Sequence, residues 1–260
     1  MSIITFMSDF GLRDHYVASV KAKILSLAPS IQVVDLTHAI DEFNISHAAF
    51  VLGAVFRDFP EGTVHLVAVN AQETQLEKFI ALELEGHFFV GTDNGIFSLI
   101  SDVQPNTIVQ IADLKTSKSN TFAAKSLLAP IAIALAQGVA IESLGEKLDF
   151  LNKKFNRQIK VTRNTIGGNV IHIDHFGNLI TNISKEAFEP LRDKREFTIK
   201  FRRQSINTIH LNYTSVDEAE CAIFFNSLGY LEIAINKGNA AQLLGMEYDS
   251  PVLIEFYPSY

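Results

Sequence analysis

The chain has 260 residues, of which 47% are hydrophobic and 20% are charged, so it can bury a sizeable core. Its formal net charge of −7 argues against nucleic acid or an anionic membrane as the main partner, because both require a basic surface. Cys221 is the single cysteine, which excludes an internal disulfide, and no apolar run reaches the length of a membrane span. Charged residues at 9, 13 and 14 interrupt any signal-peptide core, and we expect a soluble cytoplasmic protein.

The first third of the chain alternates between apolar strands and amphipathic helices. Apolar spacings of three and four residues mark the helices, and Ala-Pro at 28–29 ends the first of them. This β-α-β-α-β order predicts parallel strands joined by right-handed crossovers. The expected elements are strands at 3–8, 31–36 and 63–69 and helices at 14–27 and 45–59.

Two acids follow the first strand, Asp9 at its end and Asp14 before the first helix. In an open α/β sheet, ligands bind beyond the carboxyl ends of the strands, so both acids are candidates for ligand binding. The alternative is that Asp9 only forms the turn and that Asp14 only caps the helix, as aspartate commonly does.

Later segments follow a different pattern. Antiparallel strands are expected at 79–83 and 87–91, and a helix within 121–137. Beyond these segments, short strands separated by turn residues are typical of a compact β-barrel. The prediction is therefore an α/β N-terminal domain with a mainly parallel sheet at 1–150, a linker at 151–165, and an antiparallel C-terminal β-barrel domain at 166–260.

One polar segment of the C-terminal half, residues 173–182, places Asp174, Phe176 and Asn178 around a glycine. An aromatic ring with carboxylate and amide groups suits a purine, which can stack on the ring and form hydrogen bonds with an amide along its edge. The alternative is a hairpin turn served by the Asp and the Asn, which leaves Phe176 without a role. No His or Cys spacing typical of a metal site occurs, so no metal is expected.

Six motifs then follow one another in order along nearly the whole chain. They are Met7-Ser-Asp-Phe-Gly-Leu-Arg-Asp14, Val34-Asp-Leu-Thr-His38, Phe59-Pro-Glu-Gly-Thr-Val-His65, Asp93-Asn-Gly95, Ile173-Asp-His-Phe-Gly-Asn178 and Asn226-Ser-Leu-Gly-Tyr-Leu-Glu-Ile-Ala234. Together they resemble the S-adenosylmethionine (SAM) hydroxide adenosyltransferase family, which includes the SAM-dependent fluorinase and chlorinase. The resemblance implies an α/β domain joined to a β-barrel, and homotrimers that bind SAM between subunits. SAM or adenosine would be the ligand, with no separate cofactor.

The resemblance also implies roles for individual residues. Asp9 would accept hydrogen bonds from both ribose hydroxyls, Asp14 and Asp174 would hold the methionine ammonium, and Phe43 would wall the ribose. Phe176 and Asn178 would hold the adenine. The remaining substrate-binding residues would be Tyr16, Phe122, Tyr213, Asn226 and Ser227.

The family's reaction displaces methionine from the ribose C5′ of SAM, and its hydrolases activate the attacking water with an Asp, an Arg and a His. The matching positions in this chain are Asn70, Glu77 and Ala123. An amide is no base, and alanine offers no proton acceptor, so the usual activation is missing. Glu73 occupies a position of the halogenases' halide pocket, where an acid repels the anion.

Three functions therefore stay open. The first is an active SAM hydrolase that uses other groups for catalysis, with Asn70, Glu73 and Glu77 as the candidates and one of the two glutamates as the base. Alternatively, it is a catalytically silent SAM- or adenosine-binding protein. The third possibility is an enzyme acting on a related adenosyl or nucleoside substrate. All three stay open because one fold can carry sites with different functions.

Overall fold

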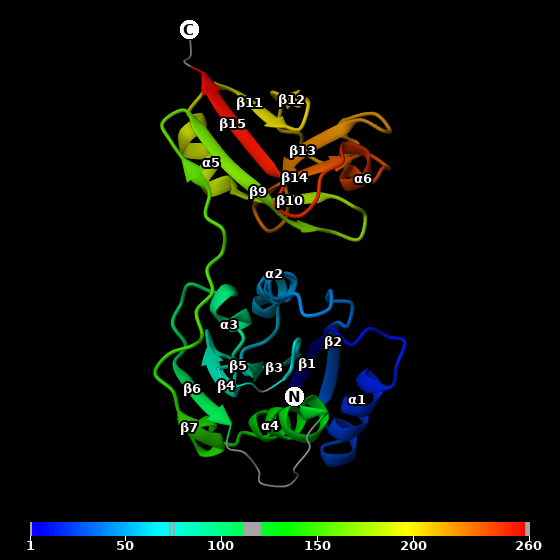
Figure 1. The fold of residues 1–260 in the computed structure, drawn as a ribbon, viewed down its shortest axis with the longest axis vertical. Helices are drawn as coiled ribbons and strands as arrows, with labels where there is room; N and C mark the ends of the chain where they lie inside the picture. The colour runs from blue at the N-terminus through cyan, green and yellow to red at the C-terminus, as the bar shows by residue number, and fades with distance from the viewer. Residues whose placement is uncertain (1, 73, 75, 112–120, 258–260) are drawn as a thin grey trace. The chain divides into compact units, whose positions relative to one another are not determined.

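A computed structural model describes residues 2–72, 74, 76–111 and 121–257. The chain divides into two compact units, Met1–Phe155 and Asn156–Tyr260, and each is described by itself (Figure 1). The linker expected at 151–165 spans this division, and the domain limits given above stay a prediction. Within the described ranges, no helix combines the length and the apolar character that a bilayer span requires.

The N-terminal unit confirms the expected β-α-β-α-β start. Its elements are β1 (Ile3–Ser8), α1 (Tyr16–Leu27), β2 (Gln32–Thr37), α2 (Ile45–Val55), η1 (Phe56–Asp58), β3 (Val64–Ala68), β4 (Phe79–Leu84), β5 (His87–Thr92), α3 (Ile96–Leu99), β6 (Thr107–Ile111), η2 (Ala124–Leu128), α4 (Ala129–Ala136), η3 (Ile141–Leu144) and β7 (Gly145–Lys147). The segments η1 and η3 are short 3₁₀ turns, and η2 is a π-helical turn that leads into α4.

These strands form one seven-stranded sheet in the order β2-β1-β3-β5-β4-β6-β7. The first four strands of this order are parallel, whereas the pairs made by β4, β6 and β7 are antiparallel. The expected mainly parallel sheet is thus corrected to a mixed sheet. The reason lies in the turn at Glu85 and Gly86, both with positive φ, since a two-residue turn can join only antiparallel strands.

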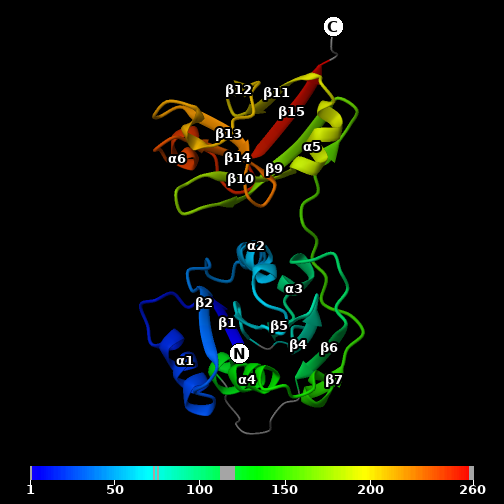
Figure 2. The ribbon, with the colours of Figure 1, turned by 180° about the vertical axis from the view of Figure 1, so that it is seen from behind.

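Helices cover both faces of this sheet (Figures 1 and 2). Phe6 of β1 packs in one apolar cluster with Val20 of α1 and with residues of α4. Met7, the next residue, packs in a second cluster with Leu52 of α2 and with residues of α3. Because successive strand residues point to opposite faces, the central strands are apolar throughout, and polar residues collect where they end.

The C-terminal unit is built around antiparallel strands. Its elements are β8 (Lys160–Val161), β9 (Thr165–Ile173), β10 (Leu179–Ser184), α5 (Lys185–Arg192), β11 (Glu196–Phe201), β12 (Gln204–Ile206), η4 (Tyr213–Ser215), β13 (Cys221–Phe225), β14 (Tyr230–Ile235), α6 (Ala240–Leu244) and β15 (Pro251–Tyr257). The strand order is β12-β11-β15-β9-β10-β14-β13, with β8 beside β9.

Strand β9 joins the two halves of this antiparallel sheet. Its first part pairs with β15, and its last part pairs with β10. The sheet encloses an apolar cluster that includes Phe188 of α5 and Met246 after α6. The predicted antiparallel architecture is confirmed, whereas closure of the sheet into a barrel stays a prediction.

A buried histidine pair lies near the amino ends of the parallel strands. Thr5 Oγ1 is 2.8 Å from His65 Nδ1, and His65 Nε2 is 3.2 Å from His87 Nδ1. All three residues are buried. Burial, and secondarily the neighbouring His87, lower the pKa of His65 to about 3. His65 is therefore neutral in the folded protein throughout the mildly acidic range.

We expect the stability of the N-terminal unit to fall as the pH drops from about 6.5 toward 5. An unfolded histidine binds a proton near its usual pKa of about 6.5, whereas folded His65 does not, so acid favours unfolding by up to about 1.4 kcal/mol per pH unit. Denaturant titrations between pH 5 and 7 measure this slope. His65→Gln should have a shallower slope than the parent protein, and an unchanged slope would contradict the assignment.

Candidate functional site

Polar residues gather at the carboxyl ends of the parallel strands in the N-terminal unit. Asp9 follows β1, His38 follows β2, Asn70 follows β3, and Asp93 and Asn94 follow β5. The buried Asn94 side chain donates to the Val69 carbonyl at 3.0 Å, which ties the end of β5 to the end of β3. This edge is the ligand-binding edge of an open α/β sheet.

The Asp9 carboxylate fixes two loops of this edge. Its Oδ2 atom accepts the backbone N–H of Phe43 at 3.2 Å and that of Asn70 at 3.0 Å. In the part of the chain that is described, no hydrogen bond reaches its Oδ1 atom. Asp9 is therefore more than a turn former, because it draws the loops after β2 and β3 together.

Both residues that donate to Asp9 have left-handed backbones, with φ of 60° at Phe43 and 46° at Asn70. Asparagine tolerates this region, but phenylalanine rarely adopts it, at a cost of about 1 kcal/mol or more. The Phe43 ring is left 62% exposed at the rim of this edge, where it can pack against a bound molecule.

Asp14 does not form the helix cap that was the alternative for it, because no side chain makes a capping hydrogen bond at the start of α1. Helix α1 begins at Tyr16 after His15, and no side chain caps its first turn. Asp14 is exposed in the preceding turn, so its carboxylate is open to solvent.

Tyr16 and Phe122, both predicted ligand-binding residues, lie together in an aromatic cluster. Their ring centroids are 5.3 Å apart, and Phe10 lies 5.7 Å from Tyr16 and 5.8 Å from Phe122. Phe10 is the neighbour of Asp9 along the chain, so the cluster and the carboxylate belong to the same turn after β1. The π-helical turn η2 starts two residues after Phe122, and such turns are frequent at functional sites.

The candidate catalytic residues are placed less uniformly. Asn70 is half-buried beside Asp9, whereas Ala123 is buried in the apolar core below Phe122. Glu77 is half-buried, and its N–H donates to Thr74 Oγ1 at 2.9 Å. Glu73 lies outside the described residues.

Glu77 has a second acid nearby, Asp93. Burial is the main cause that raises the pKa of Asp93, and the negative charge of Glu77 raises it further. Both Asp93 oxygens accept the N–H of Asn152 at 3.0 Å, so this buried carboxylate serves the fold at the end of β5. The two acids bring negative charge to this end of the strand edge.

In the C-terminal unit, Asp174 organises the β9–β10 turn. Its Oδ1 accepts the N–H groups of Phe176 at 3.0 Å and Asn178 at 2.8 Å, and its Oδ2 accepts the Asn178 side-chain amide at 2.9 Å. Asp174 therefore forms the turn, and its contact with a ligand stays a prediction. Phe176 is 73% exposed at the tip of the turn, where its ring has a free face.

Glu232 of β14 is a polar residue that sequence reasoning missed. It is only 3% exposed, and its carboxylate accepts the Tyr213 hydroxyl at 2.7 Å and the Asn226 side-chain amide at 3.1 Å. It thereby holds two predicted ligand-binding residues in one cluster. The available signal was an acid inside the otherwise apolar strand 230–235.

The Glu232 cluster adjoins the Asp174 turn. Burial, the bond to Glu232 and the charges of Glu232 and Asp174 together raise the pKa of Tyr213, so the phenol stays protonated. Asn226 Oδ1 accepts the N–H groups of Leu228 and Tyr230, which leaves neighbouring Ser227 exposed. The C-terminal candidates are thus grouped around two carboxylates.

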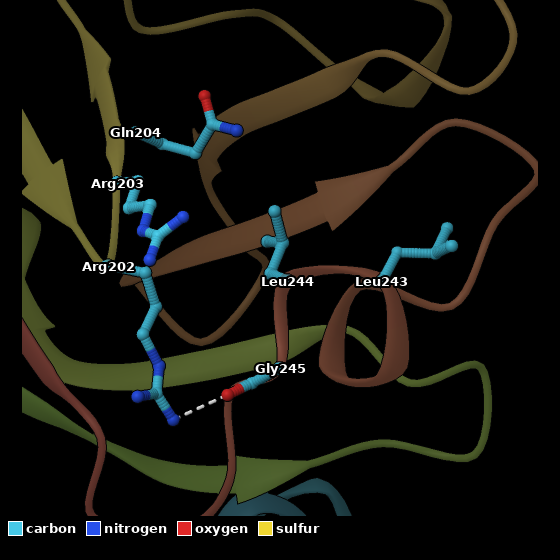
Figure 3. A pocket seen from close by; sticks show the side chains of 6 residues that line it. All are labelled: Arg202, Arg203, Gln204, Leu243, Leu244 and Gly245. Carbon is cyan, nitrogen blue, oxygen red and sulfur yellow. Dashed lines mark hydrogen bonds between the residues drawn. The ribbon is translucent and has the colours of Figure 1, made fainter.

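A separate hollow of about 500 Å³ lies between the β11–β12 turn and α6 (Figure 3). Arg202 crosses its floor and donates to the Gly245 carbonyl, while Arg203 and Leu243 line its sides. None of the predicted site residues lines it, so the candidate site lies elsewhere. Among the described residues, no group of three or more His, Cys, Asp or Glu is arranged to hold a metal ion.

The mixed α/β unit, the antiparallel unit and the polar groups at their strand ends define a two-domain ligand-binding protein. A model of the SAM hydroxide adenosyltransferase N-terminal domain matches residues 4–145, and a model of the C-terminal domain matches residues 168–253. The chain belongs to the SAM hydroxide adenosyltransferase family.

Similar proteins agree with this membership. The (R)-S-adenosyl-L-methionine hydrolase of Methanocaldococcus jannaschii is 29% identical over 95% of this chain and 94% of its own length. A fluorinase of an Actinoplanes strain is 24% identical over 90% of this chain and 91% of its own length. A crystal structure of a conserved protein from Thermotoga maritima is 31% identical, with a TM-score of 0.88 over 96% of this chain and 99% of that one.

We expect Tyr213→Phe to lower the free energy of unfolding of the C-terminal unit by about 2 kcal/mol. The change removes a hydrogen bond to the buried, charged Glu232 and leaves one carboxylate oxygen without its donor. Urea titration measures the loss. The exposed Tyr248 is the matched control, and Tyr248→Phe should change stability by less than about 0.5 kcal/mol. Equal effects of the two variants would contradict the role of Glu232.

Proposed function

We propose that the protein binds SAM and hydrolyses it to adenosine and methionine. The observation that carries this proposal is the Asp9 carboxylate, pinned through Oδ2 by two backbone amides with Oδ1 left for a ligand. A fixed carboxylate is a suitable acceptor for the vicinal hydroxyls of a ribose. The family membership and the names of the similar proteins support SAM as the source of that ribose.

In this proposal the N-terminal unit contacts the ribose and the methionine. Asp9 accepts the ribose hydroxyls, and the exposed Phe43 ring packs against the sugar. Asp14 has the freer carboxylate for the methionine ammonium, because Asp174 already accepts three hydrogen bonds in its own turn. Tyr16 and Phe122 supply an aromatic wall beside Asp9.

The C-terminal unit would contact the adenine. Phe176 offers an exposed ring for stacking. The side-chain Nδ2 of Asn178 donates to Asp174, and its side-chain oxygen Oδ1 would accept a hydrogen bond from the adenine amino group. Tyr213, Asn226 and Ser227 extend this surface, with the first two held by Glu232. The homotrimer and the cytoplasmic location expected above belong to the same proposal.

The reaction is a displacement at the ribose C5′. A water oxygen forms a bond to C5′ while the C5′–S bond breaks, and the bonding electron pair neutralises the sulfonium as methionine leaves. The proton of the water passes to a base. Among the candidates that the structure describes, Glu77 is the acid, and it is half-buried. Because the sulfonium is a good leaving group, orientation of the water can supply much of the rate.

A second function is favoured by the positions of Asn70 and Ala123. The Asn70 side chain is an amide, the Asn70 backbone N–H donates to Asp9, and Ala123 is a buried apolar residue. Neither can accept the proton of water. A silent SAM- or adenosine-binding protein would keep the Asp9 site and lack a base. An enzyme acting on a related adenosyl substrate is the third candidate carried from the sequence.

Incubation with SAM and chromatography of the products test the proposal. Adenosine and methionine formed above the buffer rate support hydrolysis. SAM binding in calorimetry without product would overturn hydrolysis and support the silent protein. If Asp9→Asn binds SAM as tightly as the parent protein, the site itself is misassigned.

If Glu77 is the base, Glu77→Gln should lower kcat by about 10²–10⁴-fold with little change in KM, because the amide cannot accept a proton. Initial-rate kinetics measure the two constants separately. Glu142→Gln alters an exposed glutamate of η3 and should leave both constants unchanged. A Glu77→Gln variant with parental kcat would remove Glu77 from the mechanism.

A further inference from the structure

A chain of four polar side chains runs from the surface of the N-terminal unit to the base of the Asp9 turn. Lys21 Nζ lies 2.6 Å from Asp35 Oδ2, and His38 Nε2 lies 3.1 Å from Asp35 Oδ1. His38 Nδ1 lies 2.8 Å from Ser8 Oγ. Ser8 and His38 are buried, whereas Lys21 and Asp35 are partly exposed, so the chain passes from solvent into the interior.

An irregularity in the sheet produces this alignment. Strands β1 and β2 pair in parallel up to Phe6, after which Leu36 is left over as a bulge in β2. The shift brings His38, rather than Thr37, level with Ser8. Bulges of this kind redirect side chains and are common next to active sites.

Two contacts hold the His38 ring. Its Nε2 atom faces the Asp35 carboxylate at 3.1 Å, without the geometry of a hydrogen bond, and its Nδ1 atom shares a hydrogen bond with the Ser8 hydroxyl. Ser8 Oγ in turn accepts the N–H of Phe10 at 3.4 Å. The Ser8–His38 hydrogen bond is therefore the contact that joins the His38 ring to the turn at Asp9.

His38 holds the chain on both sides of Asp9. Through its ring it binds Ser8, the residue before Asp9, and through Ser8 it reaches the N–H of Phe10. Its backbone carbonyl accepts the N–H of Gly11 at 2.8 Å. His38, which directly follows β2, thus contacts the chain both before and after Asp9, at Ser8 and at Gly11.

We propose that His38 is a positioning residue for ligand binding, which acts through Ser8 to aim the Asp9 carboxylate. This inference rests on the proposed function, in which Asp9 holds the ribose of SAM. A carboxylate displaced by a fraction of an ångström no longer presents its remaining oxygen, Oδ1, to the ribose hydroxyls, so the loss should fall on SAM affinity.

The sheet provides a matched control for a merely structural role. Thr5 and His65 form a second hydroxyl–imidazole pair between β1 and a neighbouring strand, with the same 2.8 Å distance and complete burial. This pair lies toward the amino ends of the strands, away from Asp9. Variants of both pairs should destabilise the fold, but only variants of the Ser8–His38 pair should weaken ligand binding.

The experiment compares SAM binding by calorimetry, with thermal unfolding of each variant. His38→Leu should weaken the Kd for SAM by about tenfold or more, while His38→Asn, which keeps an acceptor near the Nδ1 position, should recover most of the affinity. His65→Leu should leave the Kd unchanged despite its lower Tm. Ser8→Ala, paired with Thr5→Val, repeats the comparison should His38→Leu fail to fold.

Amide hydrogen exchange of residues 8–11 gives a second measurement that needs no ligand. Exchange should be faster in the Ser8 and His38 variants than in the parent protein, and unchanged in the Thr5 and His65 variants. The inference is overturned if the Ser8 and His38 variants bind SAM like the parent protein while Asp9→Asn does not. Absence of SAM binding by the parent protein would instead overturn the proposed function, and this inference with it.

Discussion

The hydrogen bonds from Phe43 and Asn70 to the Asp9 carboxylate are the contacts on which the candidate site depends. One oxygen gathers the loops that follow three adjacent parallel strands, and both donors adopt left-handed backbones to reach it. Left-handed conformations cost energy, so they persist where surrounding contacts demand them. These hydrogen bonds fix the Asp9 carboxylate and both loops in one arrangement.

The C-terminal unit uses carboxylates in the same way. Asp174 accepts three hydrogen bonds within its own turn, and buried Glu232 accepts one each from Tyr213 and Asn226. In each case an acid accepts hydrogen bonds from predicted ligand-binding residues and fixes their positions. Loss of such an acid destabilises the fold and disturbs the ligand-binding surface together, because buried donors are left without acceptors.

The sequence predicts much of this architecture, since period and turn chemistry are local properties. The β-α-β-α-β start, the β4–β5 hairpin and the antiparallel strands of the second unit follow from them. Contacts between distant segments are not encoded locally. The bulge at Leu36 that aligns His38 with Ser8, and the partners of Glu232, depend on register and could not be predicted. Local chemistry can also mislead: Asp14 is a residue type that favours helix capping, yet it forms no cap on α1.

Tight binding and catalysis make different demands on this arrangement. Contacts to ribose, adenine and ammonium are the same in SAM and in the transition state, so they lower the free energy of both equally and give affinity without rate. Acceleration has to come from groups that act on the water and on the C5′–S bond. Asn70 offers an amide there, and Ala123 offers a methyl group. In the proposed function, affinity for SAM would therefore depend on Asp9 and its supports, whereas turnover would depend on whether an acid such as Glu77 reaches the water.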